Sequence, residues 1–153
     1  MWDIFEDTGA NEYATWIWEI KCSSDLSADN PNSYYPGDKY VDWIGLSAYS
    51  RAGKETGSMS FNELIRDTYS EIHNNHQNKP IMQAEFGTTQ RSSQPHWVKN
   101  AYITIKSRPG MKAALYWDYP DTFIKPNDNL YLSEESLAAL KEILKDPYWI
   151  TAK

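Results

Sequence analysis

The chain has 153 residues, of which 41% are hydrophobic and 24% charged, and its formal net charge is −6. Its aromatic content of 14% excludes an intrinsically disordered chain, because such chains are poor in aromatic residues. The negative charge without a basic cluster argues against a nucleic-acid partner, and the lack of an apolar run of about 20 residues argues against a membrane span.

Two short runs of β-branched and aromatic residues in the first third of the chain predict strands. They cover residues 15–20 and 41–49, and a loop rich in Ser, Asp, Asn and Pro separates them. Ser60 and Glu63 then form a capping box in front of apolar residues with helical spacing. This pattern predicts a helix that ends near residues 74–75.

The rest of the chain alternates in the same way. Residues 81–87 and 113–118 predict two further strands, Pro95 suits the first turn of a helix between them, and Ser133 suits the cap of a last helix. Strands that alternate with helices are typical of parallel βαβ units. We therefore predict an α/β fold with four parallel strands in one domain, residues 1–153. The carboxyl ends of its strands should gather the functional side chains at one edge.

Glu85 is the most informative residue at a predicted strand end. It closes an apolar run and precedes Phe86 and Gly87, where the backbone must turn. One interpretation is a solvated glutamate at the rim of the sheet. The other is a catalytic carboxylate in an aromatic-walled cleft, since Tyr49 and Trp117 end neighbouring runs and sugar rings stack well on such side chains.

Two longer segments resemble glycoside hydrolase family 26, which holds β-mannanases and some β-glucanases and β-xylanases on a (β/α)8 barrel. Residues 35–45 (YPGDKYVDWIG) resemble the segment entering its sixth strand, and residues 79–87 (KPIMQAEFG) resemble its seventh strand. Residues 16–18 are similar to the fifth strand and residues 114–118 to the eighth. A complete barrel needs about 200–250 residues. The resemblance therefore implies a partial TIM-barrel-like fold, a half barrel made of strands five to eight.

The resemblance also implies a function and a site. Glu85 matches the nucleophile of a retaining glycoside hydrolase, and Tyr49 matches the tyrosine that hydrogen-bonds this carboxylate. Trp117 matches the aromatic floor of the subsite at the cleavage point, and Trp18 is a weaker match to a cleft wall. The implied substrate is β-linked mannan or a related plant polysaccharide, cleaved through a glycosyl-enzyme. Neither a metal ion nor a cofactor is implied.

The acid/base of the family is a Glu at the end of the fourth strand, and no such strand precedes residue 15. Glu12 follows an Asn, as the acid/base does in related barrels, but it should lie at the amino-terminal edge of the sheet. Glu19 ends its strand at the correct edge without a supporting motif. We therefore expect little activity from this chain alone. The alternative is a carbohydrate-binding or structural remnant without turnover.

Half a barrel leaves two strand edges and an apolar sheet face in need of cover. The chain is then a fragment, or it associates with a second copy to complete a barrel-like core, or its sheet flattens. We expect the homodimer. The compartment stays open, because the family is extracellular while residues 1–7 lack the features of a signal peptide.

Three residues with chemically active side chains fit no motif. His73 and His76 lie three residues apart near a helix end, but nothing nearby completes a metal site, so we predict solvated surface histidines. Cys22, the single cysteine, forms no internal disulfide and is expected to be a passive thiol.

Overall fold

A parallel four-stranded sheet forms the centre of the computed structural model, which describes residues 1–23, 25–27, 29–119 and 129–149. The strands are β1 (Ile17–Lys21), β2 (Trp43–Ser50), β3 (Ile81–Thr88) and β4 (Met111–Tyr116). They lie in the order β1-β2-β3-β4, and every neighbouring pair is parallel. The predicted α/β fold with four parallel strands is therefore confirmed.

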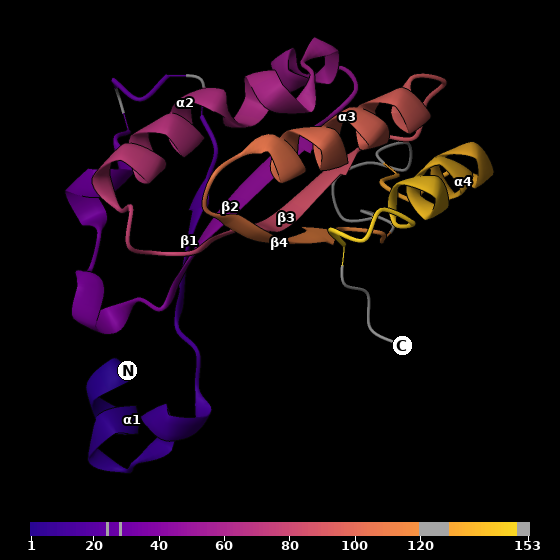
Figure 1. The fold of residues 1–153 in the computed structure, drawn as a ribbon. Helices are drawn as coiled ribbons and strands as arrows, with labels where there is room; N and C mark the ends of the chain where they lie inside the picture. Colours follow the sequence, from indigo (N-terminus) through magenta and orange to yellow (C-terminus); the bar gives the residue numbers. More distant parts are fainter. Residues whose placement is uncertain (24, 28, 120–128, 150–153) are drawn as a thin grey trace.

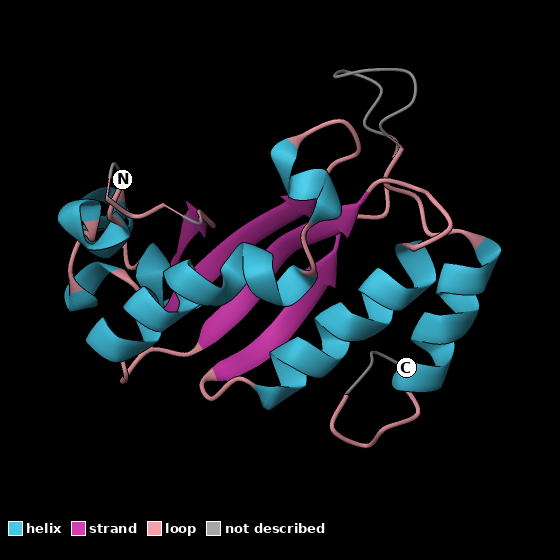
Figure 2. Ribbon diagram, turned by 90° about the horizontal axis from the view of Figure 1, so that it is seen from above, coloured by secondary structure: helices cyan, strands magenta, loops and turns pink. Residues whose placement is uncertain are grey.

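Three longer helices cover one face of this sheet (Figure 1). They are α2 (Phe61–Asn75), α3 (Gln94–Ser107) and α4 (Glu134–Ile143). The view from above shows α2 and α3 running along the sheet, with α4 beside α3 (Figure 2). Each of the three follows a strand, as the alternating pattern predicts.

Several short elements were not predicted. The helix α1 (Trp2–Asp7) lies apart from the helix layer, near the N-terminus (Figure 1). In the part of the chain that the structure describes, four 3₁₀ helices lie in the connections: η1 (Ala10–Tyr13), η2 (Pro31–Tyr34), η3 (Asp38–Tyr40) and η4 (Glu55–Ser58). A single helical turn carries too few residues to show a periodic apolar pattern, so the sequence gives no signal for it.

The helix starts agree with the predicted caps. The hydroxyl of Ser60 accepts a hydrogen bond from the backbone N–H of Glu63, and the Glu63 carboxylate accepts one from the backbone N–H of Ser60. Ser133 caps α4 by accepting from the backbone N–H of Ser136. Each bond satisfies a backbone donor that has no partner within its helix.

The hydrophobic core lies between the helices and the sheet. β2 supplies Ile44, Leu46 and Ala48 to it, and β3 supplies Ile81 and Phe86. The apolar face of α2 meets them with Phe61, Leu64, Ile65, Tyr69 and Ile72. Because side chains alternate along a strand, every second residue points away from this core, toward the other face of the sheet.

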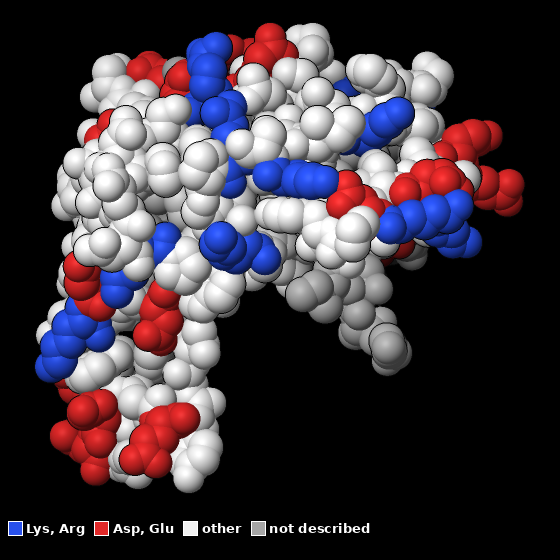
Figure 3. Space-filling view, in the orientation of Figure 1, with Lys and Arg blue, Asp and Glu red and all other residues white. Residues whose placement is uncertain are grey.

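The other face of the sheet is open. Ile17, Leu115 and Trp117 keep 46%, 51% and 43% of their surface exposed. The space-filling view shows the molecule hollowed below the sheet, beside the N-terminal part (Figure 3). Within the described ranges no strand pairs with the outer edge of β1 or β4. The sheet is thus a partial barrel with one uncovered face, called the open face below.

No helix in the described part of the chain is long and apolar enough to cross a bilayer.

Candidate active site

A bulge in β3 directs Glu85 onto the open face. Leu46 pairs with Gln83 and the next residue of β2, Ser47, pairs with Glu85, so β3 carries one extra residue, Ala84, at this point. The extra residue reverses the alternation of the strand. As a result Gln83 and Phe86 both face the helices and are fully buried, whereas Glu85 points to the other side.

Gln83 holds the bulge from within the core. Its side-chain amide donates to the backbone carbonyl of Leu46 at 2.9 Å and to that of Glu85 at 3.0 Å. A bulge interrupts the regular ladder and leaves carbonyl groups without a strand partner, which is costly when they are buried. The Gln83 amide donates to two carbonyl groups beside the bulge, and it thereby supports the backbone that carries the Glu85 carboxylate.

Tyr49 and Glu85 form a hydrogen-bonded pair on the open face. The Tyr49 hydroxyl donates to Oε2 of Glu85 over 2.7 Å. Tyr49 lies near the end of β2, directly opposite Gly87 of β3. A Cβ at Gly87 would lie 3.4 Å from the Tyr49 ring, so the ring packs close to this part of β3. The two residues are therefore held by adjacent strands, with one carboxylate oxygen bound and the other directed elsewhere.

The phenol of Tyr49 stays protonated at neutral pH. Burial raises its pKa above the ordinary value of 10, and the hydrogen bond to Glu85 and the negative charges of Glu85 and Glu19 raise it further. The Arg51 guanidinium acts in the opposite direction and lowers the pKa, but the net shift is upward. Tyr49 is consequently a permanent hydrogen-bond donor to the Glu85 carboxylate.

Glu19 is a second carboxylate on the open face. It accepts a hydrogen bond from the hydroxyl of Ser47, the residue of β2 that pairs with Glu85. Glu12 lies instead in η1, before β1 begins, which agrees with its predicted position at the amino-terminal edge. Of the two alternatives for the acid/base, the structure brings Glu19 into the neighbourhood of Glu85 and leaves Glu12 at the far edge.

Trp117 follows β4 directly and lies next to the Glu85 strand. Its backbone N–H donates to the carbonyl of Phe86 at 2.8 Å, which ties it beside the residue after Glu85. The preceding residue, Tyr116, packs its ring against Phe86 on the helix side. Trp117 therefore turns to the open face, where 43% of its surface is exposed. Three of the four predicted site residues share this edge of the sheet.

The fourth, Trp18, lies elsewhere, and the expectation of a cleft wall is corrected here. Its ring packs against Tyr34, Tyr35 and His76 at centroid distances of 4.9 to 6.1 Å, and it borders the hydrophobic core. It precedes Glu19 in β1, so the two side chains point to opposite faces of the sheet. Trp18 belongs to the helix-covered face and is not brought together with Glu85.

His76 is part of the same aromatic cluster, which corrects the prediction of a solvated surface histidine. Its ring lies 4.1 Å from that of Tyr35, centroid to centroid, and its Nε2 is 2.8 Å from the side-chain oxygen of Asn32. His73 likewise stacks on Tyr69, with the ring centroids 5.4 Å apart. Both histidines therefore pack against aromatic rings. The sequence spacing gave no sign of this, because the partners are distant along the chain.

The environment of His76 predicts a pH-dependent stability. Burial lowers its pKa, although the charges of Asp38 and Glu71 act to raise it. Protonation is then harder in the folded chain than in the unfolded chain, whose histidines titrate near pH 6.5. The stabilisation is complete above about pH 6.5 and is lost as the pH falls through the folded-state pKa.

We expect the free energy of unfolding to fall below pH 6.5, with a slope of up to about 1.4 kcal/mol per pH unit from this one group. Urea denaturation at pH 7.5, 6.0 and 5.0 measures this slope. His76→Gln should flatten it, whereas His96→Gln, at an exposed residue, should leave it unchanged. Equal slopes in wild type and His76→Gln would contradict the assignment of this pH dependence to His76.

Cys22 is a thiol in a poorly solvated position. Burial raises its pKa to about 12, although a hydrogen bond with Thr68 acts to lower it. The thiolate is the nucleophilic form of cysteine, and it is therefore scarce at neutral pH. Within the described ranges, no three His, Cys, Asp or Glu side chains lie together as a metal site.

Sequence reasoning missed the residues that support the site. Gln83 and Ser47 fix the backbone of Glu85 and the carboxylate of Glu19, and neither was singled out. A signal for Gln83 is present, since it is a polar residue inside an otherwise apolar run. Ser47 offers none, because its role depends on a partner from another strand.

Comparisons with known proteins point to one family. Residues 1–102 match the family model of glycosyl hydrolase family 26. A curated relative, endoglucanase H of Acetivibrio thermocellus, is 28% identical over an alignment of 147 residues, which covers 93% of this chain and 16% of that protein. The chain thus spans about one sixth of this relative.

Solved structures show the same fold at low identity. The catalytic domain of the family 26 endo-β-1,4-mannanase of Bacillus sp. JAMB-750 superposes with a TM-score of 0.59 at 21% identity, over 86% of this chain and 38% of that chain. An endo-β-1,4-mannanase double mutant of Cellulomonas fimi gives a TM-score of 0.56 at 21% identity, over 89% and 31%. This chain therefore accounts for less than two fifths of either structure.

Proposed function

Because the chain belongs to glycosyl hydrolase family 26, we propose that Glu85 is the nucleophile of a retaining glycoside hydrolase site. One observation carries the proposal. The Glu85 carboxylate lies on the open face near the carboxyl end of its strand, with one oxygen held by the Tyr49 hydroxyl at 2.7 Å. Catalytic groups of parallel (β/α) barrels gather at this edge. We further propose that the four strands correspond to strands five to eight of the family's barrel.

The geometry suits the first chemical step. The Glu85 oxygen that is not bound by Tyr49 attacks the anomeric carbon, while the bond from this carbon to the glycosidic oxygen breaks and its electron pair leaves with that oxygen. Tyr49 holds the carboxylate in one orientation, so less rotational freedom is lost on reaching the transition state. Water then hydrolyses the glycosyl-enzyme ester and regenerates the carboxylate of Glu85.

The substrate class we propose is β-linked mannan or a related plant polysaccharide. The solved relatives reported above are endo-β-1,4-mannanases and the curated one is an endoglucanase. Trp117 offers an exposed indole beside the Glu85 strand, on which a sugar ring can stack. Plant polysaccharides occur outside the cell that degrades them, so we propose an extracellular site of action.

The acid/base is proposed to come from outside the four strands. A retaining pair needs its carboxyl groups about 5–5.5 Å apart. β2 separates the strands of Glu19 and Glu85, so these strands lie about 9–10 Å apart. Glu19 pairs with Gly45 and Glu85 with Ser47, which adds an offset of two residues along the strands, and Glu19 is bound by Ser47. Without an acid/base, polymer hydrolysis by this chain should be slower by roughly 10²- to 10⁴-fold.

An assay on soluble mannan and β-glucan tests the function. Reducing-end release that is slow in the wild type and absent in Glu85→Ala would support a glycoside hydrolase with a displaced acid/base. Retention of the protein in mannan-containing gels without any release would favour the binding remnant instead. Fast mannan hydrolysis by this chain alone would overturn the proposal that the acid/base lies outside it.

We also propose that the open face is covered by a second copy of the chain. Three apolar side chains are exposed on or beside it, Ile17, Leu115 and Trp117, and both outer strand edges lack a strand partner in the described part of the chain. Such surfaces tend to associate. Size-exclusion chromatography with light scattering should therefore show a dimer. A well-folded monomer at high protein concentration would contradict this assembly.

A further inference from the structure

The bulge in β3 interrupts the pairing of this strand with both of its neighbours. After Gln83 the register shifts toward β4 as well as toward β2. On the β4 side, Gln83 pairs with Ala114 and Phe86 pairs with Tyr116, so three steps along β3 meet two steps along β4. The bulge is therefore a feature of β3 itself. Because the regular ladder is disrupted on both sides, groups outside the ladder have to hold residues 83–85 in place.

Gln83 binds this segment from the core, where its side chain is fully buried. The two hydrogens of its amide are directed to two backbone carbonyls, that of Leu46 at 2.9 Å and that of Glu85 at 3.0 Å. These bonds tie β2 to β3 at the residue that carries the carboxylate. Its own oxygen, Oε1, is buried and has no hydrogen-bond partner in the part of the chain that the structure describes. A buried acceptor without a partner is unfavourable, so the orientation of this side chain is set by its donors.

Gln94 is a second fully buried glutamine, and its contacts differ in one respect. Its amide also donates to two backbone carbonyls, that of Thr88 at 3.1 Å and that of Tyr131 at 2.9 Å. However, its Oε1 accepts from the backbone N–H of Ser133 and from the hydroxyl of Ser136, both at 2.9 Å. A glutamine that joins elements of the core thus uses both ends of its amide, whereas the glutamine of the bulge uses only the donor end.

Gly45 of β2 leaves room for the bulge on the open face. A Cβ at this position would lie 3.0 Å from the Cβ of Ala84 and 3.1 Å from Cγ2 of Ile17. Both distances are shorter than the usual separation of about 3.5–4.0 Å between carbon atoms in contact. The bulged segment is therefore confined on two sides. The Gln83 amide binds it from the core, and Ala84 packs closely over Gly45 on the open face.

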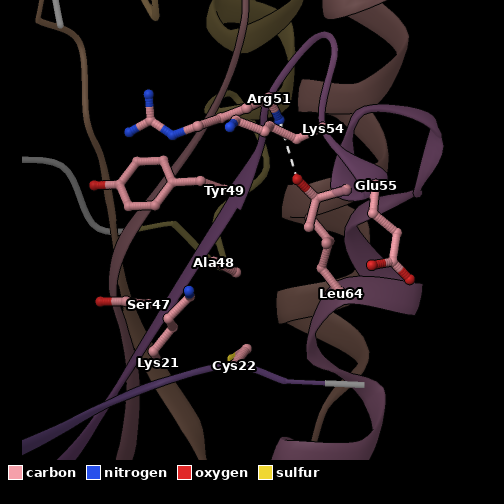
Figure 4. A pocket seen from close by; sticks show the side chains of 10 residues that line it. Lys21, Cys22, Ser47, Ala48, Tyr49, Arg51, Lys54, Glu55 and Leu64 are labelled. Atoms are coloured by element: carbon pink, nitrogen blue, oxygen red, sulfur yellow. Dashed lines mark hydrogen bonds between the residues drawn. The ribbon is translucent and has the colours of Figure 1, made fainter. Parts of the chain in front are cut away.

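The hydrogen-bond partner of Glu85 is fixed by β2. In Figure 4 the side chains of Ser47 and Tyr49 leave this strand on the same side, and that of Ala48 leaves it on the opposite side. The Tyr49 hydroxyl meets Oε2 of Glu85 at 2.7 Å. This distance depends on how β3 is placed against β2 at Glu85, and the Gln83 amide binds both strands at that point.

We propose that Gln83 is a positioning residue for the reaction at Glu85. By binding the backbone of Leu46 and of Glu85 from the core, it keeps the Glu85 carboxylate within hydrogen-bond distance of the Tyr49 hydroxyl. It is buried away from the substrate and acts through Glu85. The effect on the reaction rests on the proposed function, whereas the effect on the hydrogen bond between Tyr49 and Glu85 does not.

The first test follows the Cζ carbon of Tyr49 by NMR in the whole chain, labelled at this carbon in every tyrosine. Tyr49→Phe identifies the signal by its loss, and the signal reports on the hydrogen bond that the hydroxyl makes. Gln83→Met removes both donors and keeps an unbranched side chain, so the Tyr49 signal should move toward that of free tyrosine. Gly45→Ala presses on Ala84 from the open face and should move it in the same direction. Gln94→Met, a matched loss of two buried donors, should leave it in place.

The second test measures the rate at which dinitrophenolate is released from 2,4-dinitrophenyl β-cellobioside, whose leaving group needs no acid. Gln83→Met should slow this release by about 10- to 100-fold, the usual effect of a small misplacement of a reacting group. Gln94→Met should keep the wild-type rate. Gln83→Met combined with Tyr49→Phe should be little slower than the slower of the two single variants, because both changes act on one hydrogen bond.

Three results would overturn the proposal. They are a Tyr49 signal that stays in place in both Gln83→Met and Gly45→Ala, an equal shift in Gln94→Met, and rate losses that multiply in the double variant. If the Tyr49 signal moves but the wild type forms no glycosyl-enzyme on Glu85, Gln83 positions the carboxylate and the nucleophile assignment fails. A glycosyl-enzyme on Glu85 with an unmoved Tyr49 signal gives the reverse.

Discussion

Glu85→Gln is expected to abolish the burst of dinitrophenolate that the wild type releases from 2,4-dinitrophenyl β-glycosides of mannobiose or cellobiose. Dinitrophenolate leaves without protonation, so the first step needs the nucleophile but no acid. If the acid/base lies outside the four strands, as proposed, the second step lacks a general base. The wild type should then release up to one equivalent per site and turn over slowly afterwards. Loss of the carboxylate should lower the burst rate by at least about 10³-fold.

The glutamine variant isolates the chemistry from the structure. Its side-chain amide is nearly isosteric with the carboxylate and its oxygen can still accept from the Tyr49 hydroxyl. Stopped-flow absorbance measures the burst. Glu135→Gln, at an exposed residue of α4, serves as the matched control and should behave as wild type. A burst of normal size and rate in Glu85→Gln would contradict the assignment of the nucleophile.

Tyr49→Phe is expected to slow the same burst by about 10- to 100-fold while its amplitude stays near one equivalent. The change removes the hydroxyl that donates to Glu85 Oε2 but keeps the ring that lies against Gly87. A hydrogen bond to a charged group is worth about 1.5–3 kcal/mol, which converts to this range of rates. The carboxylate would remain present but would be held less firmly.

The control for Tyr49→Phe is Tyr69→Phe. The Tyr69 hydroxyl donates to the backbone carbonyl of Pro109 at 2.6 Å, between α2 and the turn before β4, and it lies in the helix-covered core. Its removal should lower the free energy of unfolding by about 1 kcal/mol and leave the burst rate unchanged. The role of Tyr49 in positioning Glu85 is contradicted if both variants change the rate equally, or if Tyr49→Phe affects stability alone.

The arrangement of the fold was predictable because it depends on local patterns. The alternation of apolar runs with capped helices, marked by Ser60 and Ser133, indicated parallel βαβ units, and parallel strands bring their carboxyl ends to one edge. That rule alone placed Tyr49, Glu85 and Trp117 near one another. The strand pairing confirms this placement, whereas the catalytic roles of these residues stay predictions.

What the sequence could not show depends on register and on partners distant along the chain. Without the bulge at Ala84, regular alternation along β3 would place the Phe86 side chain on the open face. The local sequence gives no sign of the extra residue. Trp18 was placed at a cleft wall from its position near a strand end. Its face of the sheet is set by packing against Tyr35 and His76, which a motif of three residues does not encode.

The most direct test of the account is mass spectrometry of the protein after incubation with a 2,4-dinitrophenyl β-glycoside. Because the second step is slow without a general base, the glycosyl-enzyme should accumulate. We predict that the intact mass rises by one glycosyl group and that peptide mapping places this group on Glu85. A glycosyl group on Glu19 or any other residue, or a protein that stays unmodified, would contradict the claim that Glu85 is the nucleophile.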